Sequence, residues 1–410
     1  MAIETKSTTF SPDKHEEEVQ EENLSKETRT YLDTLNSHTT GLTPPLPPGK
    51  RPVAIGRPWW RSITSPLAVL FIAVAVLLAL VSFGMGASIN APVVSSSNNS
   101  ASSSSSSSSS SMDSQSGTQT TPSNVPNATQ NYGNQLAKYT IDPDGAKHFT
   151  LTAYQVMWQP VKGGQRVLAW SINGTVPGPM IRVTAGDHVR VTFINHFPAA
   201  TAVHWHGLEV PSDQDGVPGV GQKPIQPGQT YVYDFYVHDS DVGTHWYHSH
   251  YNDMVQVPGG FYGAFIVDPR PGTPAAKAFA ADVDYTMIIS EMGPYYVING
   301  KSFPDTQPII VKHGQTVHIR LIGAGEMIHP MHLHGHLFYL FAQSSGLLAQ
   351  PIPMDTIEVA PGGTYDIRFT AWAAPGSIYP FHCHILSHLM NPGQSEGEMG
   401  GLIVLVEYAK

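Results

Sequence analysis

From residue 138 onward the sequence repeats itself, and this duplication limits the possible folds more than any other feature of the chain. The stretch "INGTVPGPMIRVTAGDHVRVTFIN" resembles "INGKSFPDTQPIIVKHGQTVHIRLIG", and "PGQTYVYDF" resembles "PGGTYDIRF". The motifs "HWHG" and "WYHSH" of the first copy correspond to "HLHG" and "PFHCH" of the second. We therefore predict one fold used twice, in domain 1 (138–272) and domain 2 (276–410), because each copy has the length of a single compact unit.

Short apolar segments and frequent turn residues predict that each copy is a β-sandwich. "HVRVTF", "YVYDFYV" and "TVHIRLI" alternate or run apolar over strand lengths, and 37 glycines and 34 prolines punctuate the chain. We expect an all-β fold class with two tandem Greek-key β-sandwich domains. The net charge of −10 argues against nucleic acid as a partner.

The region before the repeats differs from them in composition and predicts a tail, a membrane span and a linker. The uncharged stretch "PLAVLFIAVAVLLALVSFGMGA" has the ~20 apolar residues that a helix needs to cross a bilayer. We expect a disordered tail at 1–62, a transmembrane helix at 63–88 and a serine-rich linker at 89–137.

Charge on either side of the apolar stretch predicts the orientation of the span. No Lys or Arg follows the stretch until Lys138. Four basic residues precede it, namely Lys50, Arg51, Arg57 and Arg61. This asymmetry predicts a single-pass membrane protein with a cytoplasmic N-terminus and extracytoplasmic domains. A cleaved signal peptide is the alternative, although its n-region would be unusually long.

Four histidine pairs of the form H-x-H lie at matching places in the two copies. In a strand, residues i and i+2 point to the same face, so each pair can offer two imidazoles to one side. Imidazole suits copper, zinc, iron and nickel. The eight histidines are His204, His206, His248, His250, His332, His334, His382 and His384. Their register across the duplication predicts a site for several metal ions.

The single cysteine, Cys383, stands between the two histidines of the last pair. It excludes an internal disulfide. If His382 and His384 face one side of a strand, Cys383 faces the other, where His388 and His329 can join it. Two imidazoles and one thiolate with a weak axial Met are typical of blue copper, whereas closed zinc sites commonly use more thiolates. The peptide bonds that flank Cys383 would then connect two metal centres.

Together, "HWHG", "WYHSH", "HPMHLHGH" and "HCHILSH" resemble the four copper-binding motifs of the multicopper oxidases, in order, over about residues 140–410. With two repeats, the chain is most similar to the two-domain laccase-like branch. The resemblance implies two cupredoxin domains and an enzyme that reduces dioxygen to water with electrons from a small reductant. It implies four coppers per chain, with one type 1 copper, because Ser249 stands in domain 1 where Cys383 stands in domain 2. Members of this size form homotrimers, in which domain 1 of one chain meets domain 2 of the next.

The resemblance also assigns a role to each ligand. Type 1 copper would bind His329, Cys383 and His388, and type 2 copper would bind His204 and His332. The type 3 pair would bind His206, His248, His250, His334, His382 and His384.

Two further assignments depend on less regular segments. Many members place an axial ligand ten residues after the cysteine, but that position here is Gly393. The stretch "LMNPGQSEGEM" has the character of an insertion, and we take Met399 rather than Met390 as the axial ligand. In the family the Asp of the "SDQDGVP" segment, here Asp215, helps to deliver protons; an ordinary Asp-Gly turn is the alternative.

The functional hypotheses differ in the reductant that the enzyme would oxidise. Laccase-like members oxidise phenols and aromatic amines, and we favour this class. A metal-ion oxidase acting on Cu(I), Fe(II) or Mn(II) is the alternative. A copper nitrite reductase or an electron-transfer protein would leave the paired histidines without a purpose.

Overall fold

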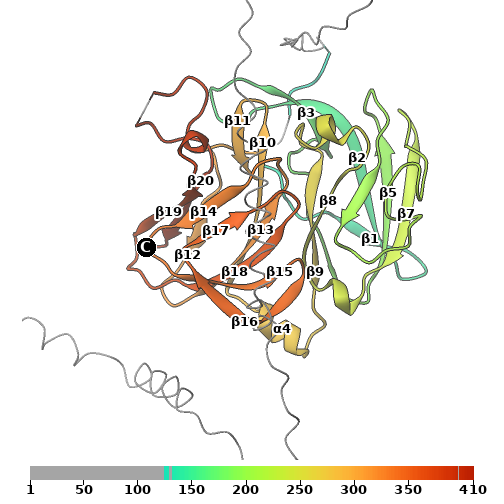
Figure 1. The fold of residues 1–410 in the computed structure, drawn as a ribbon. Coiled ribbons are helices and arrows are strands. Elements are labelled where there is room, and N and C mark those ends of the chain that lie inside the picture. The colour runs from blue at the N-terminus through green and yellow to red at the C-terminus, as the bar shows by residue number, and fades with distance from the viewer. Residues whose placement is uncertain (1–123, 129–131, 396) are drawn as a thin grey trace, which may run out of the picture. The chain divides into compact units, whose positions relative to one another are not determined.

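The computed structural model of the chain describes residues 124–128, 132–395 and 397–410, whose regular secondary structure is mostly strands joined by loops, with a few short helices. The predicted all-β fold is confirmed (Figure 1). The longest described helix is α4 (Pro274–Phe279), and no helix in these ranges is long and apolar enough to cross a membrane. The predicted tail and transmembrane helix, and most of the predicted linker, lie outside the described residues.

Domain 1 consists of two sheets that face each other across a core. In the first sheet the order is β1-β2-β5-β7, with β3 paired to β2, and in the second it is β4-β9-β8-β6. The strands are β1 (Tyr139–Ile141), β2 (Lys147–Trp158), β3 (Val167–Ile172), β4 (Ile181–Thr184), β5 (His188–Asn195), β6 (Val203–His206), β7 (Thr230–Tyr236), β8 (Gly243–Ser249) and β9 (Tyr262–Asp268). Two short helices, η2 (Asp239–Asp241) and α3 (Asp253–Gln256), flank β8.

Domain 2 repeats this arrangement with two larger sheets, β11-β10-β13-β18-β15-β16 and β12-β20-β19-β14-β17. Its strands are β10 (Val283–Met292), β11 (Tyr295–Ile298), β12 (Ile309–Val311), β13 (Thr316–Gly323), β14 (His329–Leu333), β15 (Phe338–Gln343), β16 (Gly346–Met354), β17 (Thr356–Val359), β18 (Thr364–Thr370), β19 (Ile378–Cys383) and β20 (Ile403–Tyr408). A short helix, η3 (Leu386–Leu389), follows β19.

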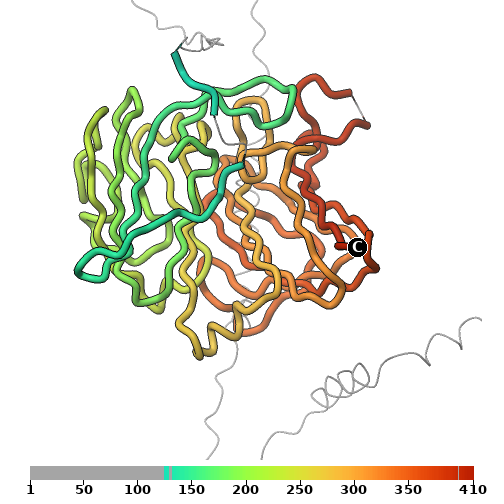
Figure 2. The backbone as a smooth tube through the Cα atoms, turned by 180° about the vertical axis from the view of Figure 1, so that it is seen from behind, coloured from blue at the N-terminus to red at the C-terminus, as the bar shows by residue number. Residues whose placement is uncertain are grey.

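Strand pairing shows that the two domains share one topology. In domain 1, β2 runs parallel to β5 and β5 antiparallel to β7; in domain 2, β10, β13 and β18 do the same. The second sheets match as well, because β4-β9-β8-β6 and β12-β20-β19-β14 have the same sequence of parallel and antiparallel pairs. The structural repeat thus follows the sequence repeat, and the two sandwiches lie side by side (Figures 1 and 2).

Alternation along the strands builds the core of each sandwich. β5 alternates between partly exposed and buried residues along its whole length, and it turns Val189, Val191 and Phe193 inward. A separate apolar cluster lies between the domains and joins residues such as Trp158 and Tyr262 of domain 1 to Met292 and Val297 of domain 2. Burial of this apolar surface favours a fixed contact between the two sandwiches.

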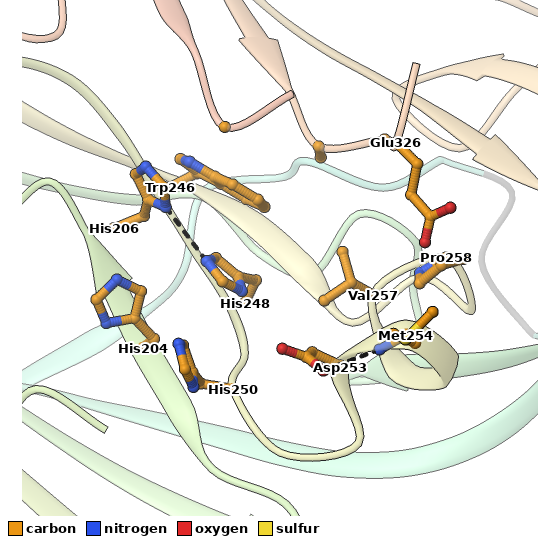
Figure 3. A pocket seen from close by; sticks show the side chains of 13 residues that line it. His204, His206, Trp246, His248, His250, Asp253, Met254, Val257, Pro258 and Glu326 are labelled. Carbon is orange, nitrogen blue, oxygen red and sulfur yellow. Dashed lines mark hydrogen bonds between the residues drawn. The ribbon is translucent and has the colours of Figure 1, made fainter. Parts of the chain in front are cut away.

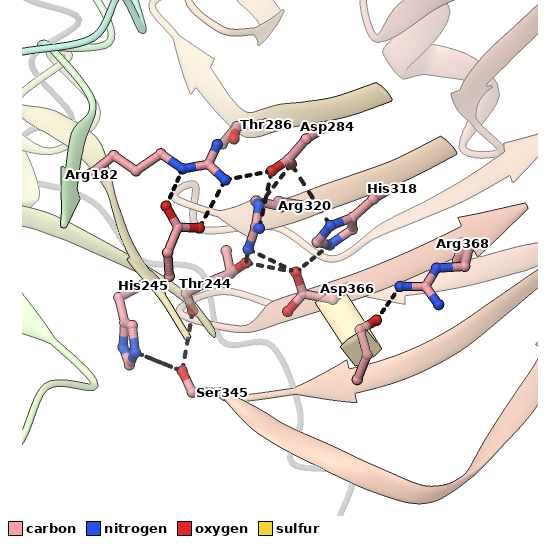
Figure 4. A network of polar contacts seen from close by, with 12 residues as sticks. Arg182, Thr244, His245, Asp284, Thr286, His318, Arg320, Ser345, Asp366 and Arg368 are labelled. Carbon is pink, nitrogen blue, oxygen red and sulfur yellow. Dashed lines mark hydrogen bonds and ion pairs between the residues drawn. The ribbon is translucent and has the colours of Figure 1, made fainter. Parts of the chain in front are cut away.

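A buried polar network also crosses the domain boundary (Figure 4). Arg320 is 1% exposed and donates hydrogen bonds to Asp284 at 2.8 Å and to Thr244 of domain 1 at 2.9 Å. Thr244 donates to the fully buried Asp366 at 2.7 Å, and Arg182 of domain 1 donates to Asp284 at 2.9 Å. Burial alone would raise the pKa of Asp284, but the charges of Arg320 and its neighbours outweigh it and lower the pKa to about 2.

We predict that Arg320→Met destabilises the chain by about 3–5 kcal/mol, because it removes the buried guanidinium beside Asp366 and one of the two arginines that pair with Asp284. Arg270→Met is the control, since Arg270 pairs with Asp239 at the surface and this variant should cost less than about 1 kcal/mol. Urea unfolding followed by tryptophan fluorescence measures both. An equal loss in the free energy of unfolding for the two variants would mean that the buried network does not stabilise the chain more than a surface ion pair does.

Candidate metal centre

Two antiparallel strands, β14 and β19, position candidate ligands on two opposite faces of one sheet. Their register pairs Met331 with Cys383 and His332 with His382. Because successive side chains alternate, Cys383 points into the core while His382 points out of it. His329 lies on the same face of β14 as Met331, two residues away, and is buried with Cys383. One strand pair therefore serves an inner and an outer group of ligands.

The inner group consists of His329, Cys383 and His388, which converge as the sequence predicts. Cys383 Sγ lies 3.8 Å from His329 Nδ1 and 3.6 Å from His388 Nδ1, and the two Nδ1 atoms are 3.2 Å apart. Three atoms at these separations leave room for one ion at the ~2.0–2.3 Å bond lengths that a first-row metal makes to imidazole and thiolate. The exposed fractions of the three residues are 0%, 0% and 4%.

A hydrogen bond directs one of these imidazoles toward the sulfur. His329 Nε2 donates to Glu291 Oε1 at 2.7 Å, so Nδ1 carries the lone pair and faces Cys383. Burial lowers the pKa of His388, with a further contribution from His329, and this favours its neutral, metal-binding form. Two imidazoles and one thiolate in this arrangement suit copper.

The outer group of domain 2 is a quartet formed by His332, His334, His382 and His384. The ring centroid of His332 lies 4.9 Å from that of His334 and 5.9 Å from those of His382 and His384. His334 Nε2 approaches His382 Nε2 at 2.8 Å. His334 and His384 are exposed, so the quartet opens onto the surface.

Domain 1 holds the matching quartet on β6, β8 and the residue after β8. The ring centroid of His204 lies 5.6 Å from that of His206 and 5.3 Å from those of His248 and His250. The four rings line a hollow of about 410 Å³ opposite α3 and Glu326 (Figure 3). Burial, with the neighbouring imidazoles, lowers the pKa of His248 to about 3 and that of His206 to about 4, so both stay neutral at pH 7.

Backbone carbonyls orient the quartets in the same way in both domains. His204 Nδ1 donates to the carbonyl of Asp215 at 2.8 Å, and His332 Nδ1 donates to that of Asp355 at 2.9 Å. His248 and His382 each donate Nδ1–H to the carbonyl of the next residue, at 2.8 Å in both cases. With Nδ1 held by the backbone, Nε2 is the ring nitrogen that each of these four histidines can offer to a metal, and those of His248 and His382 point at another imidazole of their quartet.

Asp215 lies beside the domain 1 quartet and also occupies a turn. Its Oδ1 is 3.3 Å from His204 Nδ1, and its side chain is 36% exposed. Gly216 has a φ of 82°, and a Cβ there would come within 1.8 Å of the carbonyl oxygen of Val203. The two interpretations of the Asp-Gly segment are therefore compatible, because the turn is what holds Asp215 against His204.

Met399, predicted as the axial ligand, lies at the surface, whereas the three inner ligands are buried. Its side chain is 52% exposed and lines a hollow of about 780 Å³ with Met390, His334 and His382 of the outer group. The inserted loop folds on itself instead, since Gln394 Nε2 donates to the carbonyl of Met399 and the amide of Gly400 donates to that of Leu389.

In domain 1 a hydrogen-bonded cluster stands where domain 2 has its inner group. Thr201 precedes His204 by three residues, as His329 precedes His332, and Ser249 corresponds to Cys383. Thr201 Oγ1 and Ser249 Oγ both donate to Gln256 Oε1 at 2.6 Å, and all three side chains are fully buried. A Ser, Thr and amide set is a poor match for copper, in keeping with a single inner site.

Sequence reasoning missed the residues that support these ligands. Glu291 and Tyr296 come from "SEMGPYYV", and Asp355 from "PIPMDTIEV", none of which forms a recognised metal-binding motif. The only available signal was the strand character of these segments.

Comparison with known proteins gives a consistent result. Residues 153–272 and residues 276–392 each match a sequence family described as multicopper oxidase. Copper resistance protein A of Pseudomonas syringae pv. tomato is 39% identical over 128 residues, which are 31% of this chain and 20% of that protein. Laccase-12 of Oryza sativa subsp. japonica is 32% identical over 243 residues, or 51% of this chain and 41% of that protein. The chain thus spans less than half the length of these curated relatives.

A solved structure covers the two-domain part more completely. The crystal structure of blue copper oxidase from Nitrosomonas europaea superposes with a TM-score of 0.59 at 34% sequence identity. The match covers 64% of this chain and 85% of that one.

Burial of Cys383 leads to a prediction for the metal-free chain. Burial raises the pKa of its thiol, so the unreactive protonated form persists to higher pH than in an unfolded chain, whose thiol has a pKa of about 8.5. We expect iodoacetamide, followed by mass spectrometry from pH 7 to 9.5, to alkylate the folded chain much more slowly than the urea-unfolded chain. Equal rates would mean that the thiol is exposed.

Proposed function

Because the chain belongs to the multicopper oxidase family of copper-dependent oxidoreductases, we propose that it couples one-electron oxidation of a small reductant to four-electron reduction of dioxygen to water. The observation that carries this proposal is the placement of Cys383, which faces two buried imidazoles while its neighbours His382 and His384 face a second group of ligands. A simple copper carrier would need the first arrangement only.

The described residues of one chain include a candidate donor for each of the proposed copper sites. The inner group would hold one copper, and the two quartets together would hold three, giving four per chain. Bound copper supplies the one-electron redox chemistry that side chains lack. The inner ligands are His329, Cys383 and His388, and the outer ligands are His204, His206, His248, His250, His332, His334, His382 and His384.

The chain itself supplies the connection between the two groups. Cys383 is joined by peptide bonds to His382 and His384, and its carbonyl accepts a hydrogen bond from His382 Nδ1 at 2.8 Å. The path from the inner to the outer ligands is therefore short, covalent and buried at its start.

Proton supply is the other requirement, since reduction of dioxygen to two waters consumes four protons. We propose that Asp215 delivers protons to the domain 1 quartet. Its carboxylate is partly exposed and lies against His204, so it can exchange protons with water and reach the quartet.

The separation of the quartets supports a homotrimer in which neighbouring chains share each oxygen-reducing site. The domain 1 quartet lines one hollow, His334 and His382 line another, and among the described residues the two hollows share no lining residue. Each quartet supplies four of the eight outer imidazoles. Domain 1 of one chain facing domain 2 of the next would complete the donor set.

For the reductant we propose phenols or aromatic amines, supported by the similarity to a rice laccase. We further propose that the apolar stretch 66–87 anchors the enzyme in a membrane with its domains outside the cytoplasm.

Dioxygen uptake by the copper-loaded full chain with an electron-rich phenol tests the oxidase function. We expect uptake by the natural sequence and background uptake by Cys383→Ser, because the inner site loses its thiolate. Ser249→Ala, at the matching position of domain 1, should retain uptake. If copper is bound but no phenol is consumed, phenols are excluded, and Fe(II), Mn(II) or Cu(I) becomes the reductant to test.

Co-expression of two inactive variants tests the shared site. His248→Ala damages only the domain 1 quartet, and His334→Ala damages only that of domain 2. Each variant alone should be inactive, whereas mixed oligomers contain interfaces where both quartets are intact and should recover part of the uptake. A mixture as inactive as either variant would rule out a site shared between chains.

A further inference from the structure

The β10–β11 hairpin contacts both imidazoles of the inner group. Glu291 of β10 and Tyr296 of β11 are direct partners in the antiparallel register. Their side chains point to the same face of the hairpin. Glu291 meets His329, and Tyr296 meets His388. A single cross-strand pair therefore supports two ligands that come from separate segments of the chain.

The contact with Glu291 fixes the orientation of His329. Glu291 Oε1 accepts the His329 Nε2–H at 2.7 Å, while Oε2 accepts the backbone N–H of Glu326 at 2.8 Å. Both oxygens are thus engaged, and the backbone at Gly325 passes so close that a Cβ there would lie 2.2 Å from Oε2. The carboxylate has little freedom to swing away, and His329 is held with Nδ1 toward Cys383.

The contact with Tyr296 fixes the plane of His388. The two rings stack with centroids 4.0 Å apart and an interplanar angle of 23°. His388 lies in η3, a single short turn after β19. The stacked phenol ring restricts rotation of the imidazole about its side-chain bonds.

The opposite face of the hairpin is anchored between the domains. Met292, Tyr295 and Val297 are buried in the apolar cluster that also contains Trp158 and Tyr262 of domain 1. The hairpin is thus held from behind while its polar face touches the inner ligands.

We propose that Glu291 and Tyr296 are positioning residues that pre-form the inner copper site, an inference that rests on the proposed function. Without Glu291, the Nε2–H of His329 would be buried without an acceptor, and the alternative tautomer would place a proton on Nδ1, facing the sulfur. Loss of such a partner typically weakens metal binding by about 10–100-fold.

Copper titration of the full chain against a competing chelator tests the proposal, with the visible thiolate–copper absorption as readout. Glu291→Leu should bind copper at this site about 10–100-fold more weakly and shift the absorption. Glu291→Gln, whose amide oxygen can still accept the hydrogen bond, should restore most of the affinity. Tyr296→Leu should shift the absorption, whereas Tyr296→Phe keeps the stacked ring and should resemble the natural sequence.

Thermal unfolding of the metal-free variants identifies any variant that fails to fold. If Glu291→Leu does not fold, the comparison of Tyr296→Leu with Tyr296→Phe still tests the proposal. Natural affinity and absorption in folded Glu291→Leu or Tyr296→Leu would overturn the assigned role of that residue alone. A natural chain that binds copper without any thiolate absorption would overturn the proposed function together with this inference.

Discussion

The antiparallel pairing of β14 with β19 is the interaction on which the rest of the centre depends. Its register sets Cys383 against Met331 and His382 against His332, so a change of one residue would exchange the inner and outer groups. The hydrophobic demand of the core keeps that register in place, because Met331, Leu333 and Phe381 must all point inward with Cys383. Core packing and the placement of the candidate ligands are therefore fixed by the same strand pair.

The ligands could be predicted from the sequence because they follow the two-residue alternation of strands and recur in both copies of the repeat. Each H-x-H pair begins in a strand and its second histidine ends that strand or directly follows it, Cys383 closes β19, and the duplication identifies equivalent pairs. The position of Met399 does not follow from strand alternation, because Met399 lies in a loop. The shape of that loop depends on its own hydrogen bonds, such as the one from Gln394 Nε2 to the carbonyl of Met399. Glu291 was missed because its role arises from a contact across many residues with His329, which no local pattern encodes.

The domain boundary joins parts of the molecule that the sequence treats as separate units. The buried network around Arg320 and the apolar cluster around Met292 both cross it. Trp246 belongs to that cluster and stacks on His248 with centroids 4.2 Å apart, while the hairpin on the other side reaches His329 and His388. The same interdomain packing thus supports ligands of both domains, although each ligand group is formed within one sandwich.

The hydrogen-bonded cluster of Thr201, Ser249 and Gln256 gives the two copies different relationships to copper. Its polar atoms satisfy one another, so the core of domain 1 is complete without an ion. In the core of domain 2, Nδ1 of His329, Nδ1 of His388 and Sγ of Cys383 face one another. No described side chain there plays the part that Gln256 plays in domain 1. The core between the two sheets of domain 1, which emerges first during synthesis, can therefore pack without a metal ion. Copper bound at the inner group would therefore stabilise the core of domain 2 directly, whereas the core of domain 1 does not depend on an ion.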